Sequence, residues 1–323
     1  MNLYILFFVI LLIIYVVYSN YKQNPYVNKN LLTQGMDKPV IWLYYDNSEI
    51  NSRQWLDFGA RSSRALNIPF LNLCYESIVK QNQNDYRIEV IGGLSGVAEL
   101  LGGWDQLPPG LRDPIAPVNE AELNHIRVAI LAKYGGLWLS PCSICLKGFD
   151  KLPNKVVFFG TDLDETYAGP SGTTIPGFRA VWSPYANHPM FKEWTSLTYS
   201  RIAQKRGGDQ FRGDVKWDFI HFTTQYVDTG IVVDPAVEGM RKKDGKRIQL
   251  EDLLATGTGG NLPFDICGYT VYVPFPYTEL RDREMFGWFL RMSEEQIMSS
   301  DLSVKYLLQP IQVSKESQTS YAF

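Results

Sequence analysis

Residues 119–140 read NEAELNHIRVAILAKYGGLWLS, and this stretch holds a helix, its stop signal and the beginning of a strand. Asn119 is a favoured residue before the first turn of a helix, and Glu122 three residues later completes a capping-box pattern. Apolar residues then recur on one helical face, at positions 123, 126, 130, 131 and 134. Gly135 and Gly136 supply a left-handed stop. We therefore predict a helix over 119–134 that leads directly into a strand over 137–139.

Strand-like and helix-like segments alternate on both sides of this stretch. Val40–Tyr45 (VIWLYY) is apolar and rich in strand-forming residues, and a turn signal follows it. Further strands are predicted at 70–73, 86–91, 156–159, 179–182, 231–233 and 270–273, and helices at 53–66, 97–101, 190–206 and 216–226. The alternation predicts an α/β fold around a mostly parallel central sheet flanked by helices. Ligands of such sheets bind at the carboxyl ends of the strands.

Composition is that of an ordinary globular protein. Of the 323 residues, 45% are apolar and 20% are charged. The net charge is −3 and no block of like charges occurs, so we expect no nucleic-acid partner. Four cysteines are too few for a disulfide framework in a chain of this length. Cys142 and Cys145 form one CxxC pair without the second pair that a zinc site needs, and we interpret them as incidental.

An uncharged apolar run, LYILFFVILLIIYVVY at 3–18, lies near the start of the chain. It is slightly shorter than the ~20 residues of a membrane span, but its neighbours can extend it. No Lys or Arg precedes it and no good cleavage site follows, so an uncleaved anchor is favoured over a signal peptide. The expected location is therefore a membrane that the chain crosses once. Lys22 and Lys29 favour a cytosolic domain, but two charges leave the side open.

The domain organisation follows from these segments. We expect a transmembrane anchor at 1–21, a polar linker at 22–38, one α/β domain at 39–313 and a flexible polar tail at 314–323.

The sharpest acidic feature is Asp162-Leu163-Asp164, which comes directly after the predicted strand at 156–159. Two carboxylates spaced in this way on an extended loop can face one side and hold a hard divalent cation, Mn²⁺ or Mg²⁺. Such an ion neutralises the charge that builds on a leaving diphosphate. The alternative interpretation is a solvated acidic turn.

Asn124 and Arg127 lie one helical turn apart, so their side chains project from one face of the predicted helix. Arginine can hold a phosphate through two parallel hydrogen bonds. The alternative is an arginine that ties the helix to a loop carboxylate. Two further residues are catalytic candidates. His188 is one of the three histidines in the chain, and Asp214 is a candidate general base.

Three segments carry a resemblance to a known family. NHIRVAILAKYGGLWLS at 124–140, with IWLYY at 41–45 and VWSPYANHPMFKEW at 181–194, resembles capsular polysaccharide synthesis proteins and related DxD-type glycosyltransferases. The resemblance implies a GT-A (Rossmann-like) fold, a nucleotide-sugar donor, a glycan acceptor, a divalent metal and an N-terminal membrane anchor. It implies that the donor and its phosphates contact Asn124, Arg127, Tyr134, Gly135, Gly136, Gly257 and Gly259.

The chain departs from the family pattern in two places. The helix Asp of the family is Asn124 here, and Ser140-Pro141-Cys142-Ser143 stands where two carboxylates are expected. Serine and cysteine do not replace carboxylates for Mg²⁺ or Mn²⁺, which prefer hard oxygen ligands. Either Asp162 and Asp164 hold the metal, or this chain uses none, or it is not an enzyme.

Two functions follow as hypotheses. The first is a metal-assisted glycosyltransferase of the hexosyltransferase type, which moves a sugar from a nucleotide-sugar donor to a glycan or another acceptor. The second is a catalytically inactive relative, tethered to a membrane, that serves as a structural or glycan-binding protein. Proteins that resemble this family also occur in large DNA viruses, so both an endomembrane and a virion membrane fit the expected anchor.

Overall fold

The computed structural model describes residues 38–46, 49, 68–113, 118–150, 152–161, 176–204, 210–226, 232–234, 242, 248–257, 262 and 270–309. The predicted anchor, the predicted helix at 53–66 and the predicted tail lie outside these residues, as does the linker apart from Lys38. Within the described ranges, no helix has the length and apolar character needed to cross a membrane.

A six-stranded sheet in the order β2-β1-β3-β6-β5-β7 forms the centre of the described part of the chain. Its strands are β1 (Val40–Tyr45), β2 (Arg87–Gly92), β3 (Gly136–Leu139), β5 (Val157–Thr161), β6 (Pro176–Ser183) and β7 (Val232–Asp234). β1 is parallel to β2 and β3, and β5 is parallel to β7. β6 is antiparallel to both of its neighbours, β3 and β5. The predicted mostly parallel α/β sheet is therefore confirmed, with β6 running against the other strands.

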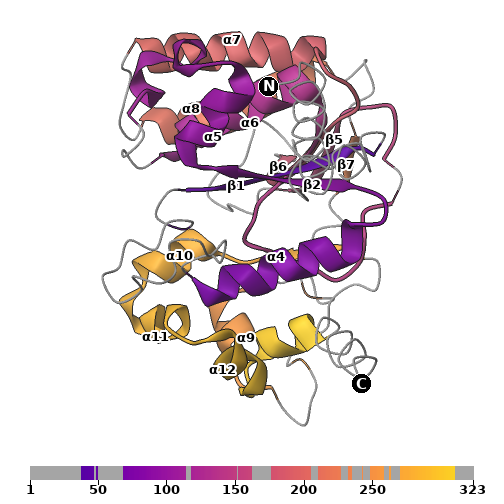
Figure 1. The fold of residues 1–323 in the computed structure, drawn as a ribbon, viewed down its shortest axis with the longest axis vertical. Coiled ribbons are helices and arrows are strands. Elements are labelled where there is room, and N and C mark those ends of the chain that lie inside the picture. The colour runs from indigo at the N-terminus through magenta and orange to yellow at the C-terminus, as the bar shows by residue number, and fades with distance from the viewer. Residues whose placement is uncertain are drawn as a thin grey trace, which may run out of the picture.

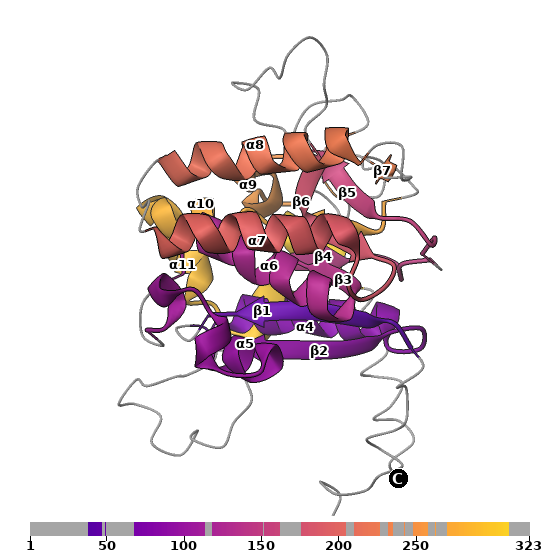
Figure 2. The same cartoon turned by 90° about the horizontal axis from the view of Figure 1, so that it is seen from above.

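Helices cover both faces of this sheet, as Figures 1 and 2 show. One face carries α5 (Gly93–Leu101), α6 (Glu120–Tyr134), α7 (Pro189–Ala203) and α8 (Gln210–Gln225). The other face carries α4 (Pro69–Asn82), α9 (Leu250–Leu254), α10 (Tyr277–Asp282), α11 (Gly287–Leu290) and α12 (Glu294–Ser299). A small second sheet pairs β4 (Ser143–Cys145) with β8 (Tyr272–Pro274), and short 3-10 turns lie at Trp104–Gln106, Pro109–Leu111 and Glu284–Phe286.

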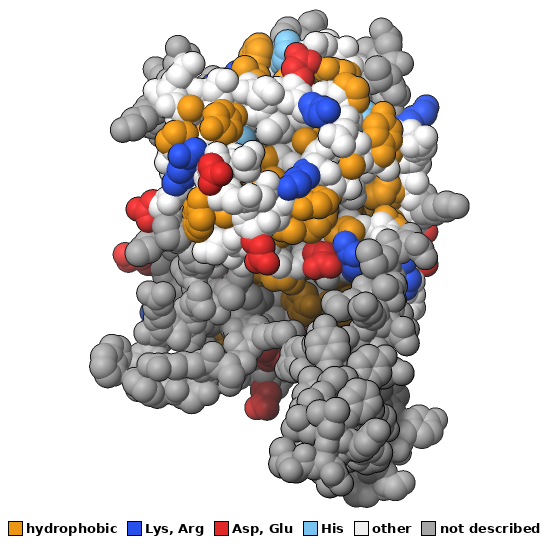
Figure 3. All heavy atoms as spheres, turned by 45° about the horizontal axis from the view of Figure 1, so that its top comes forward, with side chains coloured by type: hydrophobic (Ala, Val, Ile, Leu, Met, Phe, Trp, Pro, Cys, Tyr) orange, Lys and Arg blue, Asp and Glu red, His pale blue; other side chains and the backbone are white. Residues whose placement is uncertain are grey.

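The alternation of side chains along β1 divides the apolar core between the two faces. Ile41, Leu43 and Tyr45 join the cluster that contains α4 and the C-terminal helices. Trp42 and Tyr44 join the cluster that contains α5 to α8. Successive side chains of a strand point to opposite faces, so one apolar strand supplies two cores. Figure 3 shows the outer surface over α7 and α8, where basic, acidic and apolar side chains are interspersed.

Helix α6 forms as its local signals predict. The Asn119 side chain accepts a hydrogen bond of 3.0 Å from the Glu122 backbone N–H, and the Glu122 carboxylate accepts one of 2.9 Å from the Asn119 N–H. Gly135 ends the helix with φ at +69° and Gly136 continues at +95°. The predicted helix, its stop and the following strand are confirmed.

The predicted strand at 70–73 is wrong, because this run lies inside helix α4. Leu71, Cys74 and Ile78 are buried on one helical face. Phe70 packs against Phe275 and Phe289, whose ring centroids lie at 4.4 and 5.2 Å. A run of four residues is too short for its periodicity to separate a strand from a buried turn of helix.

Two edges of the sheet matter for function. β1 and β3 end at Tyr45 and Leu139, and we call this side the carboxyl edge; they begin at Val40 and Gly136, at the amino edge. From β1 the chain passes to β2 on one side, and then crosses back to β3 on the other side of β1. The strand order therefore reverses between β1 and β3, and open α/β sheets bind their ligands at the carboxyl edge of such a switch point.

Candidate functional site

Arg127 projects from α6 into the space between β6 and α8. Its Nη1 donates a hydrogen bond of 2.9 Å to the carbonyl oxygen of Phe178. Its guanidinium carbon lies 5.4 and 5.5 Å from the ring centroids of Phe178 and Phe219, within the range of cation–π attraction. The side chain is 2% exposed. The predicted phosphate ligand is thus a buried cation held between two aromatic rings.

No carboxylate of the described residues forms an ion pair with this guanidinium. Its Nε is buried and has no hydrogen-bond partner within the described ranges. Burial lowers the pKa of Arg127 to about 10; Glu120 opposes that shift and the nearby charge of Arg179 adds to it. A buried charge without a counter-charge is costly, and among the described residues the Phe178 carbonyl and the two rings are what offset that cost.

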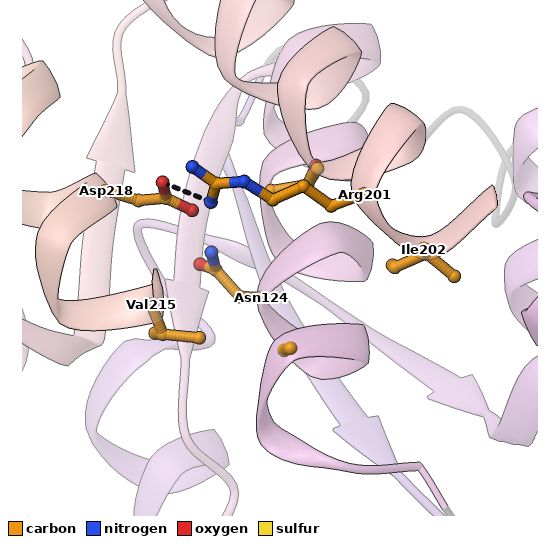
Figure 4. Close-up of a pocket in the computed structure, with 7 residues that line it drawn as sticks. Asn124, Arg201, Ile202, Val215 and Asp218 are labelled. Carbon is orange, nitrogen blue, oxygen red and sulfur yellow. Dashed lines mark hydrogen bonds and ion pairs between the residues drawn. The ribbon is translucent and has the colours of Figure 1, made fainter. Parts of the chain in front are cut away.

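Asn124 lies one turn before Arg127 and is 1% exposed. Both polar atoms of its amide, Oδ1 and Nδ2, are buried, and neither has a hydrogen-bond partner in the described part of the chain. Figure 4 shows the amide facing Arg201 of α7 and Asp218 of α8, which form an ion pair of 2.6 Å. A cavity of about 10 Å³ lies among these side chains. That is close to the least space that holds one water molecule, so a water is the partner that fits and a nucleotide is excluded.

Two tyrosines stand at the carboxyl edge of β1, one on each face of the sheet. Tyr44 packs against Trp138 with ring centroids 6.4 Å apart, and Tyr45 joins the core beneath α4. Both hydroxyl oxygens are buried, and neither has a hydrogen-bond partner among the residues that the structure describes. Burial raises the pKa of Tyr44, and the carboxylates of Asp46 and Glu49 add to the shift. Burial also raises the pKa of Tyr45. Both phenols therefore keep their protons and can donate to a ligand.

Glu49 connects the end of β1 to α10. Its Oε2 accepts a hydrogen bond of 2.9 Å from the backbone N–H of Asp46, and its carboxylate also accepts from the hydroxyl of Tyr277. The side chain is 8% exposed. Burial raises the pKa of Glu49, and the two hydrogen bonds and the charge of Arg281 partly offset that rise. The charge of Glu49 raises the pKa of both phenols, so a carboxylate lies near each of them.

The segment after β3, where the family resemblance expects two carboxylates, turns into the core. Cys142 is 7% exposed and Ser143 is fully buried. The carbonyl oxygen of Cys142 accepts a hydrogen bond of 2.8 Å from Phe275, and Ser143 starts β4. Burial raises the pKa of both Cys142 and Cys145, so their thiols stay protonated and unreactive at neutral pH.

The predicted metal ligands Asp162 and Asp164 lie outside the described residues, and so does Gly259. Asp214 falls within α8, but its side chain is not among those described. Gly257 donates its N–H to the carbonyl oxygen of Asp301 over 2.6 Å. Among the side chains that the structure describes, no group of three or more His, Cys, Asp and Glu residues is arranged to hold a metal ion. The metal site remains a prediction.

The remaining predicted site residues lie at the amino edge. The hydroxyl of Tyr134 donates to the carbonyl oxygen of Leu100 over 2.6 Å. A Cβ on Gly135 would lie 2.8 Å from the backbone of Tyr185, and one on Gly136 would lie 2.6 Å from the carbonyl oxygen of Val40. Close packing of backbone therefore accounts for both glycines.

The structure thus brings Asn124 and Arg127 together and sets them apart from the amino-edge residues. Ten residues of α6 separate Asn124 from Tyr134, about 15 Å along a helix. His188 lines a separate hollow at the amino edge. Sequence reasoning missed Tyr44, Tyr45 and Glu49. The signal was present, because VIWLYY was predicted to end at a carboxyl edge where ligands bind.

Comparison with known proteins gives weak likenesses only. No protein-family model and no curated protein sequence matches this chain. The solved structure of PaToxG glycosyltransferase is similar over 59% of this chain and 70% of its own, with 15% identity and a TM-score of 0.36. The apo form of the glycosyltransferase GlyE of Streptococcus pneumoniae TIGR4 is similar over 62% of this chain and 46% of its own, with 9% identity and a TM-score of 0.29. Likenesses of this strength decide neither fold nor activity.

Proposed function

We propose that this chain is a glycosyltransferase, which moves a sugar from a nucleotide-sugar donor to a glycan or another acceptor. The observation that carries the proposal is the set of unpartnered polar groups around the switch point between β1 and β3. The hydroxyls of Tyr44 and Tyr45 are buried there without partners, next to Glu49. Buried polar atoms in folded proteins are nearly always paired, so exceptions gathered at a ligand-binding edge support a missing ligand.

Charge supports the same class of ligand. Arg127 is a buried guanidinium without a counter-charge among the described residues, and Arg179 lies close enough to affect its pKa. The backbone of Arg179 accepts a hydrogen bond of 2.7 Å from Ser140, directly after β3. Two arginines near one strand end suit the diphosphate of a nucleotide sugar. In this proposal the arginines stabilise negative charge on the leaving diphosphate, and the phenols orient the donor.

A divalent metal, Mn²⁺ or Mg²⁺, belongs to the proposal through Asp162 and Asp164. Their carboxylates are the hard oxygen ligands that such ions prefer. When bound, the ion would neutralise charge on the diphosphate. Among the described side chains, no group of three or more His, Cys, Asp and Glu residues could hold the ion, and the proposal assigns it to these two residues.

One observation favours the non-catalytic alternative, a membrane-tethered structural or glycan-binding protein. Cys142 and Ser143 occupy the place expected for two carboxylates, and both are buried in or beside β4. The segment is thus built into the core, where it offers no ligand to a metal. A glycan-binding protein would bind sugar without the nucleotide.

Isothermal titration calorimetry of the full chain in a neutral detergent separates these functions. UDP-glucose and GDP-glucose are titrated with and without Mn²⁺. We expect micromolar to millimolar binding of one nucleotide sugar, weakened about tenfold by Tyr44→Phe or Tyr45→Phe, since one lost hydrogen bond to a charged group is worth about 1.4 kcal/mol or more. Tyr86→Phe is the matched control. Its hydroxyl donates a part-buried hydrogen bond of 2.9 Å to the carbonyl oxygen of Asp150, away from the carboxyl edge.

Each outcome distinguishes between the proposed glycosyltransferase and the non-catalytic alternative. Absence of binding to any nucleotide sugar, or equal weakening by all three tyrosine variants, overturns the proposal. Binding that ignores Mn²⁺ and survives replacement of Asp162 and Asp164 by alanine removes the metal but leaves the transferase. Binding of free glycan alone supports the alternative.

A further inference from the structure

Strand β2 is the outermost strand of the central sheet on the side next to β1. β1 pairs with it along its whole length, and no other strand of the described residues pairs with it. Figure 2 shows β2 beyond β1, and α4 and α5 contact it from the two faces of the sheet. We call the side of β2 that faces away from β1 its open side.

The pairing with β1 identifies the backbone groups on the open side. The N–H of Arg87 donates a hydrogen bond of 2.9 Å to the carbonyl oxygen of Pro39, so Arg87 directs its backbone groups toward β1. Successive residues of a strand direct these groups to opposite sides. The N–H and C=O groups of Ile88 and Val90 therefore face the open side, where no strand of the described residues pairs with them.

β2 lacks the features that usually prevent an outer strand from pairing. Natural sheets protect such strands with prolines, β-bulges or very short length. β2 has six residues and no proline, and its register with β1 runs without a shift from Arg87 to Gly92. The strand at the far side of the sheet, β7, has only three residues. Val90 is 46% exposed, so apolar surface accompanies the backbone groups on the open side.

Two charged side chains of β2 determine which strand can pair with it. Arg87 and Glu89 lie two residues apart on one face of the strand, and Nε of Arg87 is 3.0 Å from Oε1 of Glu89. Their side chains are 35% and 44% exposed. Charges of one sign on an outer strand would keep two copies apart, but these two have opposite signs. A second β2 that runs antiparallel can therefore place each charge opposite an unlike one.

Charge selects one register for this pairing. Because residues on the open sides must face each other, Ile88 can face Tyr86, Ile88 or Val90 of a second copy. The first register puts Arg87 opposite Arg87, and the third puts Glu89 opposite Glu89. The second register puts each Arg87 opposite a Glu89. It is the only one of the three that pairs unlike charges, which stabilise neighbouring strands when they lie directly opposite.

We propose that two copies of this chain pair through β2, antiparallel and about a two-fold axis at Ile88, so that one continuous sheet runs through both copies. Two-fold symmetry is the commonest in oligomers, and it joins the same surface of each copy. The backbone groups of Ile88 and Val90 supply hydrogen bonds, and the Arg87–Glu89 pairs fix the register. This dimer does not depend on transferase activity.

Sedimentation equilibrium of the full chain in a neutral detergent tests the dimer. Arg87→Glu gives β2 two negative charges, and Glu89→Arg gives it two positive charges. Each variant alone should raise the dissociation constant of the dimer about tenfold, equivalent to about 1.4 kcal/mol, because like charges then lie opposite each other. An equal mixture of the two variants should restore dimers, since each negative β2 then meets a positive one. Recovery in the mixture also shows that both variants are folded.

Two controls separate β2 from other contacts. Lys192→Glu makes the same change of charge as Arg87→Glu at an exposed position on α7, and it should leave the dissociation constant unchanged. The double variant Arg87→Glu with Glu89→Arg restores unlike pairs and should dimerise like the original chain. A monomeric original chain overturns the proposal, as does a dimer that neither β2 variant weakens. Equal weakening by Lys192→Glu, or a mixture that stays monomeric, overturns it as well.

Discussion

The guanidinium of Arg127 on α6 donates a hydrogen bond of 2.9 Å to the carbonyl oxygen of Phe178 on β6, which lies 51 residues later in the sequence. In the described part of the chain, no carboxylate pairs with this guanidinium and its Nε has no hydrogen-bond partner, so the carbonyl oxygen stands where a carboxylate is usual. The charge is held inside the core. Folded proteins tolerate such costly arrangements mainly at functional sites, which is why the proposed function assigns this arginine to binding.

Arg127→Met tests whether this arginine is kept for a ligand or for the fold. Burial that lowers the pKa of Arg127 to about 10 costs about 3 kcal/mol at pH 7. Loss of one charged hydrogen bond costs about 1.5–3 kcal/mol. These terms nearly cancel, so we expect the free energy of unfolding, measured with urea, to change by less than about 1 kcal/mol. Nucleotide-sugar affinity should fall at least tenfold. A loss of stability above about 3 kcal/mol would instead identify a structural brace.

Tyr44→Phe should make the chain more stable, although it weakens the proposed binding. The variant removes a buried hydroxyl that has no partner, and such a group costs about 1–3 kcal/mol. We expect a gain of about 1 kcal/mol in urea unfolding without ligand. Tyr86→Phe should lose about 1 kcal/mol, because its hydroxyl is bonded to Asp150. A loss in Tyr44→Phe as large as that in Tyr86→Phe would show that the Tyr44 hydroxyl is already satisfied.

His125 predicts a loss of stability in mild acid. It is buried, and its Nδ1 lies 2.8 Å from the Thr198 hydroxyl. Burial lowers the pKa of His125 to about 4, from an ordinary value of 6.5. Below pH 6.5 the unfolded chain therefore binds a proton at His125 that the folded chain does not bind. The free energy of unfolding falls until about pH 4, where the folded chain also binds it.

Between pH 7 and pH 5, His125 should lower the free energy of unfolding by about 2 kcal/mol. Urea unfolding at both pH values measures it, and His125→Gln should flatten the slope by that amount. The lowered pKa of His188 acts in the same direction, so some slope remains. An unchanged slope in His125→Gln would contradict the prediction.

Gly135→Ala should destabilise the junction between α6 and β3. The residue has φ +69°, and a Cβ would lie 2.8 Å from the backbone of Tyr185. We expect a loss of at least about 2 kcal/mol by thermal or urea unfolding. Gly96→Ala is the matched control in α5, where the new Cβ would meet Ile91 at an ordinary 3.4 Å and helix propensity should add about 0.5–1 kcal/mol. Comparable effects of the two variants would refute this explanation of Gly135.

Local signals predicted the framework of the fold. The capping box at Asn119 and Glu122 and the stop at Gly135 act within a few residues, so α6 and β3 could be placed from the sequence. Val40–Tyr45 was predicted within its observed bounds, since an apolar run with a turn signal is equally local. Helix α4 could not be placed, because Phe70 packs against Phe275 and Phe289, about two hundred residues away.

The residues of the candidate site were also predicted only in part from the sequence. Helical spacing alone put Asn124 and Arg127 on one face of a helix. Their burial and the absence of partners come from β6, α7 and α8, which the spacing does not reveal. The tertiary structure also separates His188 from Arg127. Helix α7, which follows His188, begins at the amino edge of the sheet, whereas Tyr44 lies near the end of β1, at the opposite edge.

By itself, the sequence determined the elements that have strong local signals, such as β1, α6 and β3, and which residues share a face of α6, because capping, glycine stops and periodicity act over a few residues. Only the tertiary structure decided which polar groups stay unpaired. Partners such as Phe178 reach Arg127 across 51 residues, and burial depends on every element that packs around a side chain. The chemistry proposed for Arg127, Tyr44 and Tyr45 rests on that second level.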